Sequence, residues 1–241
     1  MKTIGIAGHS AEGAALCFLT AVHEGETLLG PHMHPNIVSC AIPMGLSMPG
    51  WESGEHAEVA EHLLRGVEVV ARAGADFFVC PDNTAHIVLD QVIGRAALPG
   101  LHIAQVVCAE AVGNGWRKVG LTGTRWTMTG SAYEHAMADA GLERITPSPQ
   151  TQSRLNTLIF EELCRGVFRP ETTAVFVEAI EELAAQGAEC VILGCTEIPI
   201  IINADNSPLP VLDSTRLLGK AAARLAVSDR SLPATGWIAP F

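Results

Sequence analysis

The sequence predicts an α/β protein with parallel sheets, built as two related lobes. Short apolar segments alternate with amphipathic helical segments along the 241 residues, a pattern typical of parallel sheets. The chain also repeats itself. The segments 74–84 (GADFFVCPDNT) and 187–197 (GAECVILGCTE) both begin with small residues, continue with an acidic residue and an apolar run, and end in a polar turn.

The spacing of the repeat is nearly constant, which indicates duplication. Gly5 and Gly120 lie about 115 positions apart, and Gly74 and Gly187 lie about 113 positions apart. We therefore expect a first lobe over residues 1–112 and a second lobe over 113–210. The segment 211–241 is expected to form a C-terminal helix that packs back on the first lobe.

The spacing of apolar residues and the positions of Gly and Pro predict where the helices and strands of the first lobe lie. The helix over 55–73 has apolar Val59, Leu63 and Val67 at helical spacing, and Pro81 ends a strand. A loop rich in Gly, Pro and Met is expected over 43–54. The expected strands are 3–7, 37–42, 76–80 and 101–104, and the expected helices are 14–24, 55–73, 86–97 and 107–114.

The second lobe restarts with a strand, and glycines end its helices. Gly141 and Gly187 follow two of the expected helices, where a left-handed residue commonly terminates the helix. The expected strands are 118–124, 143–145, 190–193 and 211–212, and the expected helices are 128–140, 152–164, 172–186 and 215–227.

Composition excludes several classes of function. Hydrophobic residues make up 48% and charged residues 17%, which favours a buried core over disorder. A net charge of -11 argues against a nucleic-acid partner but leaves an anionic small molecule open. The 7 cysteines are scattered, the start of the chain leads straight into a strand, and no apolar run approaches the roughly 20 residues of a membrane span. A cytoplasmic protein without membrane contact is expected.

Cys195 is the first candidate for chemistry. It follows an apolar strand and Gly194, and the turn is expected to leave the thiol exposed near free backbone N–H groups. Those groups and a following helix dipole should lower the thiol pKa from its usual value of about 8.5. Cys190, within the strand, fits a buried inert cysteine instead.

Asp82 occupies the position equivalent to Cys195 in the first copy. It could merely cap the helix that starts at His86, but the duplication favours a catalytic role. Cys80 either lines the site from beneath or belongs to the core, since its repeat partner is the apolar Leu193.

The remaining candidate side chains lie in the turns that follow the strands. In parallel sheets such turns form the ligand-binding edge, and their hydroxyls and N–H groups suit a carboxylate, although helix capping is the alternative. The expected substrate-binding residues are His9, Ser10, Asn83, Thr84, Thr122, Thr124, Thr196 and Glu197. Neither a dinucleotide fingerprint nor a compact metal-ligand pattern occurs, so no metal is expected.

Assembled, these motifs resemble the cofactor-independent aspartate/glutamate racemase superfamily. The resemblance covers nearly the whole chain, and its most specific part is Gly194-Cys195-Thr196-Glu197. It implies two Rossmann-like lobes related by a pseudo-twofold axis, an active site in the cleft between them, and a homodimer. It also implies that no pyridoxal phosphate, metal or nucleotide is needed, and that one cysteine from each lobe faces the substrate α-carbon.

The chain departs from that pattern. Asp82 stands where the first-lobe cysteine is expected, and the basic residues that bind a side-chain carboxylate in aspartate racemases have no clear match. These departures exclude a two-thiol mechanism and leave the substrate side chain open.

The expected function is racemisation or epimerisation at the α-carbon of an amino acid or related small carboxylate. Cys195 and Asp82 would exchange protons with the two faces, which requires Asp82 to be partly protonated near neutral pH. Two alternatives stay open. One is a single-cysteine decarboxylase or cis-trans isomerase of the same superfamily, and the other is a non-catalytic carboxylate-binding relative.

Overall fold

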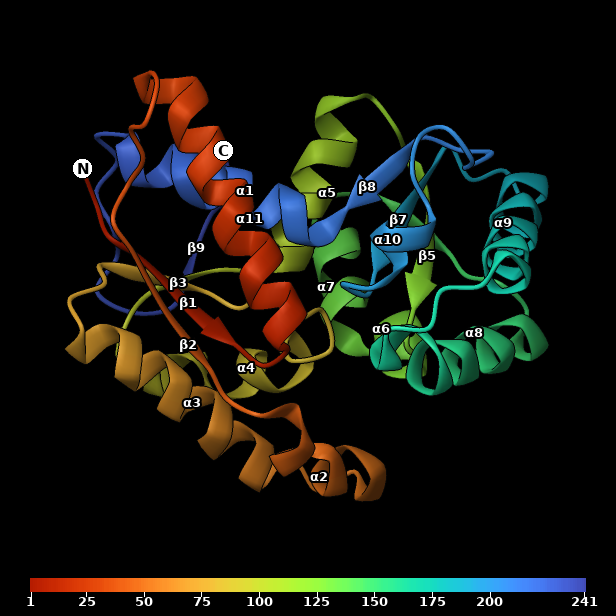
Figure 1. The fold of residues 1–241 in the computed structure, drawn as a ribbon, viewed down its shortest axis with the longest axis horizontal. Helices are drawn as coiled ribbons and strands as arrows, with labels where there is room; N and C mark the ends of the chain where they lie inside the picture. Colours follow the sequence, from red (N-terminus) through yellow and green to blue (C-terminus); the bar gives the residue numbers. More distant parts are fainter. The chain divides into compact units, whose positions relative to one another are not determined.

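The computed structural model describes residues 1–241 and divides into two compact units (Figure 1). The first unit contains Met1–Val106 and Thr215–Phe241, and the second contains Val107–Ser214. Each unit has its own sheet, and every strand pair in both sheets is parallel. The predicted α/β class is therefore confirmed.

The first unit is built on a five-stranded sheet in the order β2-β1-β3-β4-β9. Its central strands are buried because helices cover both faces, as the unbroken apolar runs require. The strands are β1 (Ile4–Gly8), β2 (Ile37–Ala41), β3 (Phe77–Val79), β4 (Gly100–Leu101) and β9 (Trp237–Ile238). The helices are α1 (Ala11–Leu29), η1 (Met44–Leu46), α2 (Met48–Ser53), α3 (Ala57–Arg72), α4 (His86–Val92), η2 (Ile93–Arg95) and α11 (Ser214–Val227).

The core of the first unit joins segments from both ends of the chain. Ile4 and Ile6 of β1 pack in one buried cluster with Cys17 of α1 and with Leu218 and Ala222 of α11. Helices α1 and α11 run side by side (Figure 1), and the salt bridge between Arg224 Nε and Glu24 Oε1 spans 2.7 Å. Burial of these apolar side chains fixes α11 against the sheet.

The second unit has a four-stranded sheet in the order β6-β5-β7-β8. The strands are β5 (Lys118–Gly123), β6 (Glu143–Ile145), β7 (Cys190–Gly194) and β8 (Val211–Asp213). The helices are α6 (Arg125–Thr129), α7 (Ser131–Asp139), α8 (Pro149–Glu161), η3 (Leu163–Arg165), α9 (Pro170–Ala185) and α10 (Ile198–Ile201). Helix α5 (Ile103–Gly113) begins in the first unit and ends in the second.

The sequence repeat corresponds to a repeat of sheet topology. Strands β2-β1-β3-β4 and β6-β5-β7-β8 follow the same order in chain terms. Gly74 and Gly187 both adopt φ 93°, a left-handed conformation that glycine takes without a Cβ penalty. Each glycine stops a helix and turns the chain into the strand that carries a candidate residue at its far end.

The acidic residue of each repeat has the same structural role. The Asp76 carboxylate accepts a hydrogen bond from the backbone N–H of Thr3 (2.6 Å), and the Glu189 carboxylate accepts one from Lys118 (2.8 Å). In each unit the acid ties the start of one strand to the start of its neighbour. The conserved position of the acid within the repeat thus reflects strand registration and not catalysis.

The structure differs from the sequence-based assignment at several places, including the expected helix over 128–140, which is divided into α6 and α7. The expected loop over 43–54 contains η1 and α2, and the expected strand over 101–104 stops at Leu101, where α5 soon begins. Strand β9 was not expected, because two residues give no periodic signal; the backbone of β4 pairs with it. None of the helices combines the length and the apolar character that crossing a membrane requires.

Candidate active site

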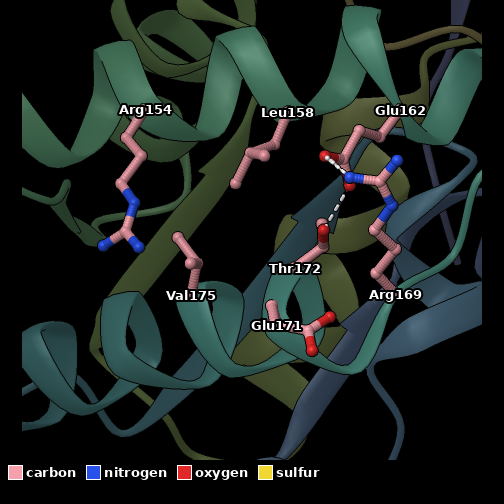
Figure 2. A pocket seen from close by; sticks show the side chains of 7 residues that line it. All are labelled: Arg154, Leu158, Glu162, Arg169, Glu171, Thr172 and Val175. Atoms are coloured by element: carbon pink, nitrogen blue, oxygen red, sulfur yellow. Dashed lines mark hydrogen bonds and ion pairs between the residues drawn. The ribbon is translucent and has the colours of Figure 1, made fainter.

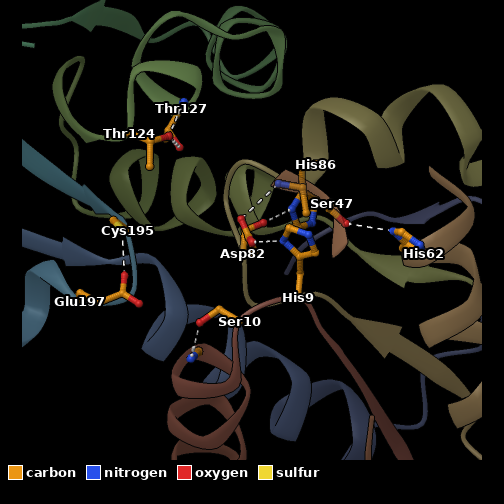
Figure 3. A network of polar contacts seen from close by, with 12 residues as sticks. His9, Ser10, Ser47, His62, Asp82, His86, Thr124, Thr127, Cys195 and Glu197 are labelled. Atoms are coloured by element: carbon orange, nitrogen blue, oxygen red, sulfur yellow. Dashed lines mark hydrogen bonds and ion pairs between the residues drawn. The ribbon is translucent and has the colours of Figure 1, made fainter. Parts of the chain in front are cut away.

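Asp82 lies in the turn between β3 and α4, and its carboxylate is held by two donors. His9 Nδ1 lies 2.7 Å from Asp82 Oδ2, and the backbone N–H of Ala85 donates to Asp82 Oδ1 at 3.2 Å (Figure 3). His9 comes from the turn after β1, the strand beside β3. The two sequence-predicted residues therefore meet because adjacent parallel strands end at the same edge of the sheet.

The surroundings of Asp82 favour its ionised form. Burial acts to raise its pKa, but the hydrogen bond and charge of His9, with the Ala85 N–H, outweigh burial and lower the pKa below the usual value. The carboxyl is thus a carboxylate at neutral pH. The expectation of a partly protonated Asp82 is wrong for this state, because a histidine distant in sequence supplies the stabilising donor.

His9 is almost fully buried, with 2% of its surface exposed. One ring nitrogen is used by Asp82, while Nε2 is buried without a hydrogen-bond partner. The ring of Trp51, from α2, lies edge-on to it at 6.3 Å between centroids. A buried polar atom without a partner is uncommon in folded proteins, and this sets His9 apart from the other candidate residues.

His86 fixes the turn that carries Asp82. Its Nδ1–H donates to the Asp82 carbonyl at 2.9 Å, and its Nε2 accepts from the backbone N–H of Ile103 at 3.3 Å. Both nitrogens are satisfied only in the neutral ring. Burial and the neighbouring His102 lower the pKa of His86 to about 3, so it stays neutral throughout the physiological range.

Three further side chains, those of Asp90, His102 and Trp237, surround His86 or hold its neighbours in place. The His86 ring stacks on Trp237 at 5.5 Å between centroids and lies 4.5 Å from the ring of His102. Asp90 Oδ1 accepts from Trp237 Nε1 at 2.9 Å and lies 3.1 Å from His102 Nε2. Sequence reasoning missed this network; the only available signal was the presence of polar aromatic residues near expected strand ends.

Cys195 lies just beyond β7 in the second unit and contacts a carboxylate. Its Sγ donates to Glu197 Oε2 at 2.8 Å (Figure 3), and Glu197 is 6% exposed. Gly194 is required before it, since a Cβ there would lie 2.6 Å from the backbone oxygen of Thr122. The close approach of β5 and β7 therefore fixes where the thiol emerges.

The thiol pKa moves in the direction opposite to the expectation. Burial raises the pKa of Cys195 well above its usual value, and the Glu197 charge raises it further. The backbone N–H of Glu197 acts to lower the pKa, as predicted for free N–H groups, but burial and charge outweigh it, and the helix that follows, α10, has only four residues. Cys195 is only half-buried by surface exposure, yet it is a thiol and not a thiolate at neutral pH.

The hydroxyl residues after β1 and β5 act as equivalent helix caps. Ser10 Oγ accepts from the N–H of Gly13 at the start of α1, and Thr124 Oγ1 accepts from that of Thr127 at the start of α6. Thr122 is fully buried and its hydroxyl donates to the Ile192 carbonyl at 2.9 Å. The Thr122 side chain thus joins two strands rather than facing a ligand.

The other predicted residues lie in the two candidate turns. Asn83 and Thr196 are buried, with 3% and 8% exposed, and Thr84 is partly buried. Cys80 is 1% exposed, and burial with the charge of Asp82 raises its pKa, so this thiol is inert core. In each unit the candidate residues therefore lie around one reactive group, Asp82 in the first unit and Cys195 in the second.

The cavities between α8 and α9 are separate from these residues. One, of about 270 Å³, is drawn in Figure 2, and a neighbouring one measures about 240 Å³. Arg169 pairs with Glu162 at 3.4 Å on the first cavity wall. No predicted site residue lines either cavity. The first is lined by Arg154, Leu158, Glu162, Arg169, Glu171, Thr172 and Val175.

Comparison with known proteins decides the family. Residues 27–222, which are most of the chain, match the protein family described as Asp/Glu/Hydantoin racemase. The chain belongs to the Asp/Glu/Hydantoin racemase family. Its predicted resemblance and its assignment as a racemase-like isomerase are thereby confirmed.

Individual relatives from this family align over nearly the whole chain. The broad specificity amino-acid racemase RacX of Bacillus subtilis (strain 168) is 26% identical over 83% of this chain and 84% of its own length. A crystal structure described as an Asp/Glu racemase from Yersinia pestis has a TM-score of 0.86 and 30% identity, covering 95% of this chain and 100% of that one. An aspartate racemase homologue from Pyrococcus horikoshii OT3 has a TM-score of 0.80 and 29% identity, with the same coverage.

Proposed function

We propose that the protein is a cofactor-independent racemase or epimerase acting at the α-carbon of an amino acid or related small carboxylate. Cys195 and the Asp82 turn supply its two proton-carrying centres. One observation carries the proposal: the pseudo-equivalent turns after β3 and β7 hold opposite protonation states, an ionised carboxylate and a protonated thiol. A base and an acid are the pair that inversion of a carbon centre needs in one direction.

The protonation states of the two turns in the free enzyme define which direction of inversion the enzyme is ready to catalyse. The unit that contains Asp82 provides the base, and Cys195 provides the proton that returns to the opposite face. After one inversion Cys195 is a thiolate, and it becomes the base for the opposite enantiomer. Glu197, which accepts the Cys195 hydrogen bond at 2.8 Å, disfavours the thiolate, and a proton from the opposite enantiomer or from solvent restores the thiol.

The proposed reaction also requires stabilisation of a carbanion-like transition state. Asn83, Thr84, Thr124 and Thr196 offer amide and hydroxyl donors beside the two reactive groups, and buried donors of this kind act more strongly than they would in water. His9, Ser10 and Glu197 are the remaining residues that we propose to contact the substrate. We leave Thr122 out of the substrate contacts because its hydroxyl is engaged by Ile192.

Solvent-deuterium incorporation tests the proposal. Candidate L- and D-amino acids are incubated with the enzyme in D₂O, and exchange at the α-carbon is followed by NMR and mass spectrometry. Exchange together with inversion is expected for at least one substrate, and Cys195→Ala should abolish inversion. Inversion that continues undiminished in Cys195→Ala, or undiminished exchange from both enantiomers, would sink the mechanism.

A decarboxylase is the second candidate, and the protonated Cys195 thiol favours it. A thiol that is protonated at rest can protonate the enediolate left by loss of carbon dioxide. The ionised Asp82 argues against it, since a carboxylate there repels a departing carboxylate. Carbon dioxide release from disubstituted malonates would select this function. Stabilisation by an amino acid without exchange would instead indicate a binding protein.

We further propose a cytoplasmic homodimer. All seven cysteines are free, which suits a reducing compartment. Sedimentation equilibrium tests the dimer, and a monomer at micromolar concentration would contradict it.

A further inference from the structure

We propose that His9 Nε2 is the atom of the first unit that exchanges a proton with the substrate α-carbon, and that Asp82 holds the His9 ring in position. This inference rests on the proposed function and assigns its first-unit proton carrier. His9 is then a catalytic residue, and Asp82 is a positioning residue that acts through it.

The hydrogen bonds around Asp82 leave it poorly placed to carry the proton itself. Asp82 Oδ2 lies 2.7 Å from His9 Nδ1, and Oδ1 accepts from the N–H of Ala85 at 3.2 Å. Only 13% of the Asp82 side chain is exposed. An ionised carboxylate only accepts hydrogen bonds, so His9 Nδ1 must carry the hydrogen between them.

When the His9 ring is neutral, a hydrogen on Nδ1 leaves a lone pair on Nε2. That atom is buried and has no partner in the protein, whereas each ring nitrogen of His86 is satisfied. Leaving a buried polar atom unpaired is unfavourable, so the arrangement favours any bound group that supplies a proton there. A carboxylate behind one nitrogen and a reactive opposite nitrogen form the geometry by which an acidic residue orients a catalytic imidazole.

An imidazole ring is also better suited than a carboxyl group to exchange a proton with the substrate near neutral pH. Its usual pKa of about 6.5 lies near neutral pH, whereas an aspartate carboxyl at about 3.9 is a weak base and is rarely protonated there. When Nε2 takes a proton, the imidazolium forms beside the Asp82 carboxylate, and the charges attract.

The proton balance of the step is complete. The Nε2 lone pair takes the α-hydrogen as a proton, and the electrons of the broken C–H bond remain on the substrate, delocalised into its carboxylate. The Cys195 S–H then gives its proton to the opposite face, forming the new C–H bond. The enzyme is left with a His9 imidazolium and a Cys195 thiolate, which the reverse reaction on the other enantiomer, or solvent, restores.

The deciding variant is His9→Asn. Its side-chain nitrogen falls near the position of Nδ1 and can still donate to Asp82, but nothing replaces Nε2. Deuterium exchange is measured in the full-length enzyme with whichever amino acid the wild type exchanges, for each enantiomer separately. We expect inversion to fall at least about a hundredfold, while exchange driven by Cys195 from one enantiomer persists.

Controls separate this result from misfolding. His23→Asn removes an exposed histidine on α1 and should leave exchange unchanged. His9→Gln provides a second variant, and thermal unfolding reports whether each protein is folded. Inversion at the wild-type rate in a folded His9→Asn or His9→Gln protein would overturn this inference and leave the proposed function intact. No exchange in the wild type would overturn both.

A spectroscopic readout is independent of turnover. In long-range ¹H–¹⁵N spectra, with His9→Asn used for assignment, the neutral His9 ring should appear as the Nδ1–H tautomer. A neutral Nε2–H tautomer would place the hydrogen on the wrong nitrogen and overturn the assignment.

Discussion

The turns after β3 and β7 hold the same position in the two units, yet they have opposite charge states. The first places a carboxylate against an imidazole at 2.7 Å, and the second places a thiol against a carboxylate at 2.8 Å. The surroundings shift both pKa values: burial raises that of Cys195 and the Glu197 charge raises it further, whereas at Asp82 burial is outweighed and His9 lowers the pKa. Duplication therefore preserves where a reactive group sits, while the residue type, its burial and its partner set whether it starts as acid or base.

Disabling the proton exchange of either unit should have the largest effect on this comparison. Asp82→Asn and Cys195→Ser should each reduce inversion by about 10²–10⁴-fold, because each removes or misorients one general acid-base group. The residual deuterium exchange should come from opposite enantiomers in the two variants. Chiral analysis of the exchanged substrate checks this.

Two substitutions away from the turns serve as controls. Asp205→Asn changes an exposed carboxylate, and Cys40→Ser changes a partly buried cysteine; both should retain wild-type inversion. Residual exchange from the same enantiomer in Asp82→Asn and Cys195→Ser would show that the two turns do not serve opposite faces.

Placing the same side chain in both turns would sharpen the comparison. In Asp82→Cys, the thiol introduced at position 82 faces His9, which favours a thiolate, whereas Cys195 faces Glu197, which disfavours one. We expect the new thiol to be alkylated at least about tenfold faster than Cys195 at pH 7. Iodoacetamide labelling resolved by peptide mass spectrometry measures both sites in one sample, and equal rates would refute the electrostatic asymmetry.

The buried His86 gives the first unit a pH dependence that the second unit lacks at its turn. The folded-state pKa of about 3 lies below the ordinary 6.5, so the unfolded chain binds more protons between these values. Stability therefore falls as pH decreases through this window, by at most about 1.4 kcal/mol per pH unit for the one group. Urea unfolding between pH 6.5 and 4.5 measures the slope.

His86→Gln should flatten that slope, and His23→Gln should leave it unchanged. The interval above pH 4.5 isolates the histidine, because the lowered pKa of Asp82 makes its contribution disappear only at more acidic pH. An unchanged slope in His86→Gln would assign the pH dependence to other groups.

The smallest effect is expected from Glu197→Gln. Neutralising this side chain removes one of the causes that raise the Cys195 pKa but leaves burial, the largest cause, in place. Alkylation of Cys195 at pH 8 should accelerate severalfold. Cys40, a partly buried free cysteine in the first unit, serves as the internal reference in the same peptide map. A slower Cys195 reaction would contradict the proposed role of the charge.

The sequence allowed much of this arrangement to be predicted, and the limits have physical causes. Strands such as β1 and β7 are continuous apolar runs, so their place and the turns after them were evident. The predicted directions of the Asp82 and Cys195 pKa shifts were both wrong, because the shifts depend on burial and on side-chain contacts. The His9 that contacts Asp82 lies 73 positions away in the sequence. The Glu197 contact is local, but its direction depends on a turn geometry that residue types do not specify.

Strand β9 has a consequence for the order in which the protein is made. Residues Val107–Ser214 form the second unit without interruption, whereas the first unit needs α11 and β9, which are translated after all of them. The second unit can thus complete its sheet on the ribosome while the first still lacks an edge strand and the Trp237 that supports His86. The base-bearing turn is encoded early, but it gains its full support only when nearly the last residues of the chain emerge.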